Sequence, residues 1–141
     1  MVIVYDKAKY HIEGDFPANL AIKQAYVHTG MFVGWLIDNQ LYSEELEEDG
    51  WEEIVHFQAR RLTGTELYQA WDGVLTDDML NREGNAFAAS YFDFEQGCYL
   101  QDYEETFASY DSLYAVEDTW ENYWTLKAVI DQRYQEWQHS K

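Results

Sequence analysis

Apolar residues recur every three or four positions along most of the chain, which is the spacing of one face of an α-helix. The pattern is clearest near the C-terminus, where a helix is predicted to begin at a cap formed by Asp118 or Thr119. The apolar positions that define this helix are Trp120, Tyr123, Leu126, Ile130, Tyr134 and Trp137.

A second long apolar segment predicts a mostly buried helix from about Pro17 to Asn39. Proline suits the first turn of a helix, because the backbone N–H that it lacks has no partner there. Gly30 and Gly34 lie one turn apart on this helix. Such a pair of small residues is expected to let a neighbouring helix approach closely.

Polar residues divide the middle of the chain into shorter helices. Ser43 is predicted to cap a short helix that Asp49-Gly50 ends. Beyond Gly50, helical spacing groups Trp51 with Ile54 and Val55. The Trp51 indole is therefore expected to be at least half buried.

The remaining helices are predicted from capping signals and aromatic spacing. Thr63 and Glu66 have the spacing of a capping box, and Asp72-Gly73 ends the helix that follows. Two more helices are expected, one beginning at Asn81 or Asn85 and the other passing through Tyr99, Tyr103 and Phe107. The first dozen residues alternate weakly, which is compatible with a short strand or an extended arm.

These elements predict a mainly α fold, an all-α bundle of about five to seven helices with a short N-terminal strand as an option. Apolar residues make up 47% of the 141 residues, enough for a buried core and too many for a disordered acidic tail. The only proline is Pro17 and no Gly/Ser-rich linker occurs, so residues 1–141 are expected to form one acidic helical domain.

The charge balance is strongly negative, because nine Lys and Arg face 27 Asp and Glu, for a formal net charge of −18. Nucleic acid and anionic lipid both repel such a surface, so neither is an expected direct partner. A basic protein is the expected partner, and its attraction should weaken as salt rises. The apolar stretch from Ala25 to Ile37 is too short and too polar to span a bilayer.

Cys98 is the only cysteine, and the first residues lack the pattern of a secretory signal. Both observations predict a cytoplasmic protein. No glycine-rich phosphate loop, HExxH, CxxC or nucleophile elbow occurs, so no catalytic residue and no cofactor is predicted.

The most acidic stretch is SEELEEDGWEE, residues 43–53, which places seven carboxylates in eleven positions. As a binding site, this stretch would pair with a basic partner around an aromatic anchor at Trp51. Alternatively, its side chains are only the solvated outer faces of two helices. The candidate partner-binding residues are Glu44, Glu45, Glu47, Glu48, Asp49, Glu52 and Glu53.

His11, Asp15 and His28 form the best small set of candidate chemistry. Two imidazoles and a carboxylate could hold a divalent metal, or could form an acid/base pair that the carboxylate orients. Sequence spacing does not show that they meet. The alternative is that Asp15 caps the long helix while the histidines bond to backbone groups.

Several short motifs resemble a bacterial family of small acidic proteins of unknown function, over nearly the whole chain. They are Tyr5-Asp6, Ala8, Tyr10-His11, Gly14-Asp15-Phe16-Pro17, His28, Gly30-Met31-Phe32, Trp35, Arg60-Arg61-Leu62-Thr63-Gly64, Asp72-Gly73, Asp77-Asp78-Met79-Leu80-Asn81, Glu83-Gly84-Asn85-Ala86-Phe87 and Val116-Glu117-Asp118-Thr119-Trp120. The resemblance implies a bacterial origin and, more loosely, genes near toxin systems in which small acidic proteins serve as immunity factors. It carries over no catalytic residue.

The leading functional hypothesis is a non-catalytic immunity protein, or antitoxin, whose acidic face occludes a basic cognate toxin. A variant is nucleic-acid mimicry, in which carboxylates spaced along an elongated face imitate phosphates. An alternative of another class is a small metal-dependent or hydrolytic enzyme that uses His11, Asp15 and His28. A further alternative is an oligomerising structural protein, because six Trp and twelve Tyr exceed what one small core needs. The sequence leaves the oligomeric state open.

Overall fold

The structure, a computed structural model, describes residues 2–140 as a mainly α fold with one small antiparallel sheet. The α-helices are α1 (Ala8–Ile12), α2 (Val27–Asp38), α3 (Glu44–Gln58), α4 (Gly64–Ala70), α5 (Arg82–Phe87), α6 (Tyr99–Thr106) and α7 (Trp120–His139). The strands are β1 (Val4–Lys7) and β2 (Val74–Thr76). Short 3-10 turns are η1 (Ile22–Tyr26), η2 (Asp77–Met79) and η4 (Leu113–Ala115), and η3 (Ala88–Phe92) is a π-helical turn. Both the helical bundle and the N-terminal strand predicted from the sequence are confirmed.

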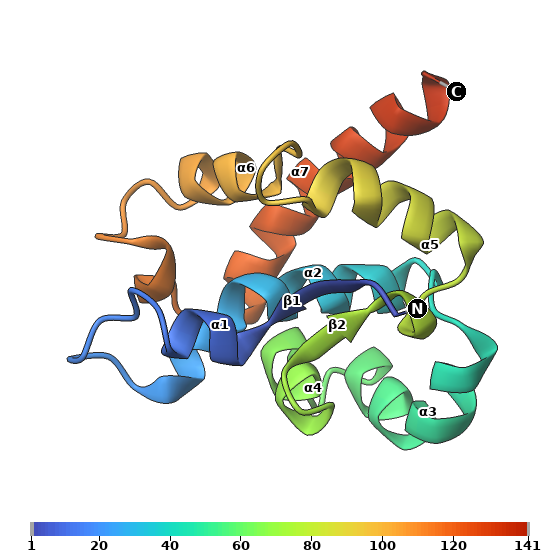
Figure 1. The fold of residues 1–141 in the computed structure, drawn as a ribbon, viewed down its shortest axis with the longest axis horizontal. Helices are drawn as coiled ribbons and strands as arrows, with labels where there is room; N and C mark the ends of the chain where they lie inside the picture. The colour runs from blue at the N-terminus through green and yellow to red at the C-terminus, as the bar shows by residue number, and fades with distance from the viewer. Residues whose placement is uncertain (1, 141) are drawn as a thin grey trace.

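Helix α2 is the centre of the core. Every residue from Val27 to Ile37 is buried, which explains why its sequence is apolar on all sides. In Figure 1, α2 crosses the middle of the view, with α3 and α4 below it and α5 and α6 above it, while α7 runs obliquely from beside α2 up to the C-terminus. One continuous cluster of buried side chains joins residues from α1 through α7.

The glycines of α2 allow α4 to pack backbone against backbone, as their spacing predicts. A Cβ atom at Gly30 would lie 2.6 Å from the Cα of Thr65, and one at Gly34 would lie 3.3 Å from the Cα of Gly64. A side chain at either position would therefore force the helices apart. The predicted capping box fixes the start of α4, where Thr63 accepts from the Glu66 N–H and the Glu66 carboxylate accepts from the Thr63 N–H.

The predicted start of the long helix is wrong. The α-helix begins at Val27, and η1 precedes it after an extended residue, Ala21. The Gln24 side chain explains part of this arrangement, because its amide donates to the carbonyls of Tyr114 at 2.8 Å and Val116 at 2.9 Å. Those contacts hold η1 against a distant loop.

The predicted interruption at Asp49-Gly50 is confirmed as a kink at Gly50 between two helical segments. Ser43 caps α3 as predicted, and Gly50, whose φ and ψ are −118° and 21°, separates the first segment from the one that ends at Gln58. A Cβ at Gly50 would lie 3.0 Å from the indole of Trp71. Glycine therefore lets α3 bend closely over that ring.

The kink also sets which face of α3 is buried. Gly50, Ile54 and Phe57 face the core. Consequently Trp51 and Val55 point outward, with 56% and 51% of their surface exposed. The expectation that Trp51 is at least half buried is therefore wrong.

Strand β1 crosses in front of α2 and pairs antiparallel with β2, with Val4 opposite Thr76 and Lys7 opposite Val74. The register shifts between Val4 and Asp6. Asp6 is the one buried residue of the strand, and it faces the first turn of α2. Strand β1 thus carries a carboxylate into the protein interior.

Helix α7 closes the opposite side of the core. Thr119 caps it, as predicted, while Asp118 accepts hydrogen bonds from the hydroxyls of Thr63 at 2.7 Å and Thr65 at 2.8 Å. The Trp35 indole N–H donates to Asp131 at 2.8 Å, which joins α2 to α7. None of the described helices is both long and apolar enough to cross a membrane.

Candidate functional site

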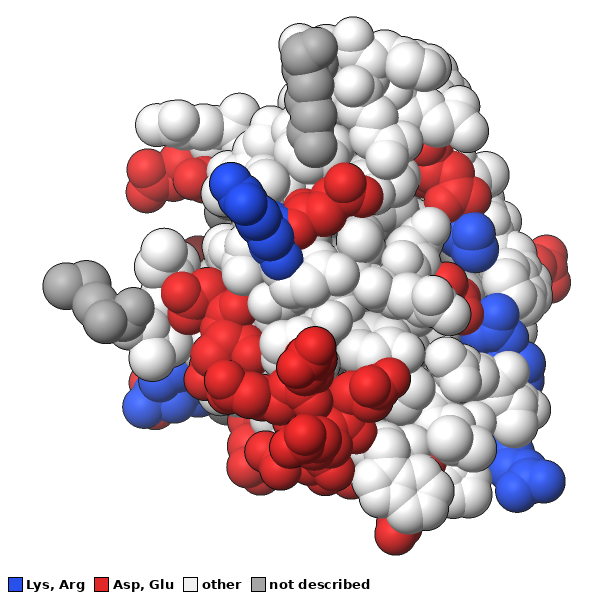
Figure 2. All heavy atoms as spheres, turned by 90° about the vertical axis from the view of Figure 1, so that its right-hand side faces the viewer, with Lys and Arg blue, Asp and Glu red and all other residues white. Residues whose placement is uncertain are grey.

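The acidic α3 surface is the first candidate site, and it consists of the seven carboxylates predicted as partner-binding residues. Six of them are exposed and Glu53 is half buried. Figure 2 shows Asp and Glu side chains gathered on the lower part of one face of the molecule, where α3 lies. Within residues 2–140, none of the seven forms an ion pair with Lys, Arg or His. Their charge is therefore not neutralised by the fold.

Trp51 and Val55 supply an apolar element within this acidic surface. They lie one helical turn apart, on the same side of α3, and both are more than half exposed. Glu52 lies between them in sequence and is also exposed. An exposed tryptophan bordered by charge is the arrangement that often forms the energetic centre of a protein interface.

The second candidate site joins Asp6, His11 and His28. His11 Nε2 lies 2.9 Å and 3.0 Å from the two Asp6 carboxylate oxygens, and 3.2 Å from His28 Nε2. His28 Nε2 lies 4.0 Å from Asp6 Oδ2. These three side chains come from β1, α1 and the first turn of α2, and we call them the Asp6–His11–His28 cluster.

Two further side chains orient the cluster. The Thr29 hydroxyl donates to Asp6 Oδ2 at 2.6 Å, and the Tyr114 hydroxyl lies 2.8 Å from His11 Nδ1. Thr29 is fully buried, whereas Tyr114 reaches the cluster from η4. Together they fix one carboxylate oxygen and one imidazole ring plane.

Burial decides the protonation of His28. Its side chain is 0% exposed, and burial lowers its pKa to about 3, an effect that the neighbouring His11 strengthens and Asp6 opposes. His28 is therefore neutral at pH 7 and can offer a nitrogen lone pair. Its Nδ1 atom has no hydrogen-bond partner among the described residues.

Asp15 does not belong to this cluster. It is exposed, in the loop that follows α1, and the carboxylate beside the two histidines is that of Asp6. The structure thus brings together the two histidines of the candidate set, with Asp6 in place of the candidate Asp15. The signal for Asp6 was weak: a single Asp within an otherwise alternating N-terminal segment, five residues before His11.

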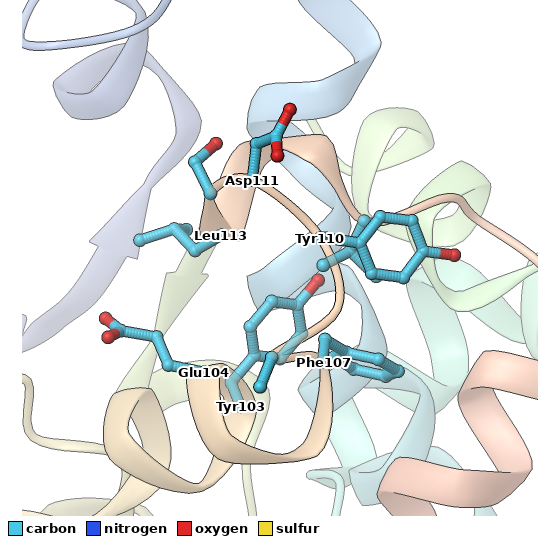
Figure 3. A pocket seen from close by; sticks show the side chains of 9 residues that line it. Tyr103, Glu104, Phe107, Tyr110, Asp111 and Leu113 are labelled. Carbon is cyan, nitrogen blue, oxygen red and sulfur yellow. The ribbon is translucent and has the colours of Figure 1, made fainter.

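The cluster is nearly closed to solvent, because Asp6 is 3% exposed and only His11, at 16%, reaches the surface. A nearby pocket of about 380 Å³ lies between α6 and the segment that follows it. Figure 3 shows the Tyr103 ring standing in the space between these segments, with Phe107 beside it. No histidine, cysteine, lysine or arginine lines this pocket, so it contains no acid/base or nucleophilic pair built on those residues.

Comparisons with known proteins give a family but no function. A search of curated proteins and a search of solved structures each found no match. One family model matches residues 4–116, a range that contains the acidic α3 surface and the Asp6–His11–His28 cluster and ends before α7. The chain therefore belongs to the family described as "Domain of unknown function (DUF7832)".

Proposed function

We propose that this protein is a non-catalytic binding protein whose acidic α3 surface occludes a basic partner, as an immunity protein occludes its toxin. The observation that carries the proposal is the exposure of Trp51 and Val55 among carboxylates that the fold leaves without ion-pair partners. The carboxylates would attract the partner's Lys and Arg and speed the encounter. The indole would supply the buried contact that holds the complex together.

Position along the chain supports occlusion more than nucleic-acid mimicry. The seven carboxylates lie within ten residues of one kinked helix. A mimic of a phosphate backbone needs carboxylates spaced along an extended face. We infer a cytoplasmic location for the complex, because Cys98 has no cysteine partner within the chain.

The test uses basic proteins encoded beside the gene, each purified and titrated with the full chain at low and high salt. Wild-type protein should bind one of them, and the affinity should fall as salt rises. Trp51→Ala should weaken binding by about tenfold or more, the typical loss at an interface anchor. A joint Glu44→Gln, Glu45→Gln, Glu47→Gln and Glu48→Gln variant should slow association and flatten the salt dependence.

The matched control is Glu104→Gln with Glu105→Gln, which removes two exposed carboxylates from α6. This variant should bind as wild type does. Absence of binding to any neighbouring basic protein at low salt would contradict the proposal, as would equal affinity in the α3 variants and the control. Competition between this protein and DNA for the same basic partner would instead favour mimicry.

A further inference from the structure

The Asp6–His11–His28 cluster has the composition and spacing of a metal site. We propose that Asp6, His11 and His28 bind one divalent transition-metal ion, with zinc the best match. This inference does not depend on the acidic α3 surface, which lies on a different helix and contributes no residue to the cluster.

The donor atoms already converge. His11 Nε2 lies 3.2 Å from His28 Nε2 and 3.0 Å from Asp6 Oδ2, and the third edge of this triangle is 4.0 Å. In a tetrahedral zinc site with bonds of about 2.0 Å, neighbouring donors are roughly 3.3 Å apart. Small shifts of the side chains would therefore place all three donors around one ion.

The hydrogen bonds alone leave this arrangement incompletely satisfied. When both rings are neutral, with the proton of His11 on Nε2 and that of His28 on Nδ1, His11 Nε2 faces three acceptors, namely both Asp6 oxygens and the lone pair of His28 Nε2. One N–H on His11 cannot point at all of them with good geometry. A cation at the centre would interact with every lone pair at once. It would also balance the buried negative charge of the Asp6 carboxylate.

The surroundings resemble the outer shell of a metal site. Metal-bound imidazoles usually have a hydrogen-bond partner on the second ring nitrogen, and Tyr114 occupies that position at His11. Ligating carboxylates are likewise hydrogen-bonded, as Asp6 is by Thr29.

The donor set selects the class of ion. Two imidazoles and one carboxylate suit zinc and its transition-metal neighbours, whereas calcium and magnesium prefer oxygen donors. Because Asp6 and His28 are buried, the ion would have little contact with solvent. Its three protein ligands would tie β1 and α1 to the first turn of α2, and the fourth position of a tetrahedral ion would be left for water.

The experiment measures zinc binding to the full chain after removal of metal with a chelator. Calorimetry and metal analysis should give one zinc per chain, and zinc should raise the melting temperature. His11→Ala should lose more than about 100-fold in affinity, and Tyr114→Phe, which removes only the outer partner, about 10-fold to 100-fold. His11 is chosen because it is the most exposed of the three ligands, so its substitution should disturb folding least.

The matched controls are Asp15→Asn and His56→Ala, two exposed residues outside the cluster, and both should bind zinc as wild type does. A second measurement needs no variant: one equivalent of zinc should shift the imidazole resonances of His11 and His28 and leave those of His56 and His139 unchanged. Failure of the metal-free wild-type protein to bind added zinc would overturn the proposal. So would equal affinity in His11→Ala and the controls, or shifts confined to His56 and His139.

Discussion

At the scale of single residues, Trp35 and Trp51 show how differently the same side chain is used. Trp35 is 0% exposed, stacks on Phe32 and donates its indole N–H to Asp131. Trp51 is 56% exposed on the outer side of α3. Helical spacing alone placed both in the core. Spacing shows that apolar residues share a face, but the rotation of the helix about its axis decides which of them are buried.

These environments give the first prediction. Trp35→Ala should lower the free energy of unfolding by about 3–5 kcal/mol, because it creates a cavity and leaves the Asp131 acceptor without its donor. Trp51→Ala should change it by less than about 0.5 kcal/mol, as substitutions on the surface usually do. Urea unfolding followed by circular dichroism measures both. A loss above about 1 kcal/mol in Trp51→Ala would show that the indole packs against the core.

Residue-level chemistry was only partly predictable. His11 and His28 stood out because histidine is rare in this chain, with four in total. Asp6 did not stand out among 27 acidic residues, since its role depends on the register of β1 against β2. Tyr114 is more than a hundred positions from His11, and nothing local signals such a contact.

At the scale of elements, chemistry at helix ends was the most reliable guide. Ser43, Thr63, Asn81 and Thr119 all cap helices where polar residues preceded apolar periodicity. These signals are local, because a side-chain oxygen bonds to an N–H only two or three residues away. Gly50 was predicted as an interruption and is one, but the ring that the kinked helix packs against, Trp71, is distant in sequence and could not be predicted locally.

The contact between α2 and α4 gives the second prediction. A Cβ at Gly64 would clash with the backbone of Gly30, so Gly64→Ala should separate the two helices. The expected cost is about 1–3 kcal/mol or more, since neither backbone has room to move within the core. Thr63→Ser, one residue earlier, keeps the capping hydroxyl and should cost less than Gly64→Ala. Thermal unfolding of the two variants compares them, and a stability of Gly64→Ala equal to wild type would contradict the close packing.

At the scale of the whole molecule, periodicity predicted a mainly α fold, but it did not predict the unusual amino-acid composition of the core. Many of its largest buried side chains are aromatic, and several are tyrosines with hydroxyl groups held inside. Tyr99 donates to the His28 carbonyl, whereas the Tyr103 hydroxyl has no hydrogen-bond partner among the described residues. Periodicity identifies these positions as buried, but it does not show which hydroxyl finds a partner.

The buried tyrosines predict how stability depends on alkaline pH. Burial raises the pKa of five of them above the ordinary value of 10.0, and these are Tyr68, Tyr91, Tyr99, Tyr103 and Tyr123. Above pH 10 the unfolded chain releases protons that the folded chain keeps, so stability falls as pH rises. Each group lowers the free energy of unfolding by up to about 1.4 kcal/mol per pH unit, and the five together lower it by up to about 7 kcal/mol per pH unit.

A loss of that size exceeds the total stability of many domains within one or two pH units, so the protein should unfold cooperatively between about pH 11 and 12. Tyrosinate absorbance and circular dichroism should change together across that transition. Tyr103→Phe should move the transition to higher pH, because it removes one buried ionisable hydroxyl without removing a hydrogen bond. Tyr10→Phe, at an exposed tyrosine, should leave the transition where it is. Gradual ionisation near pH 10 with the helices intact would mean that these hydroxyls reach solvent in the folded protein.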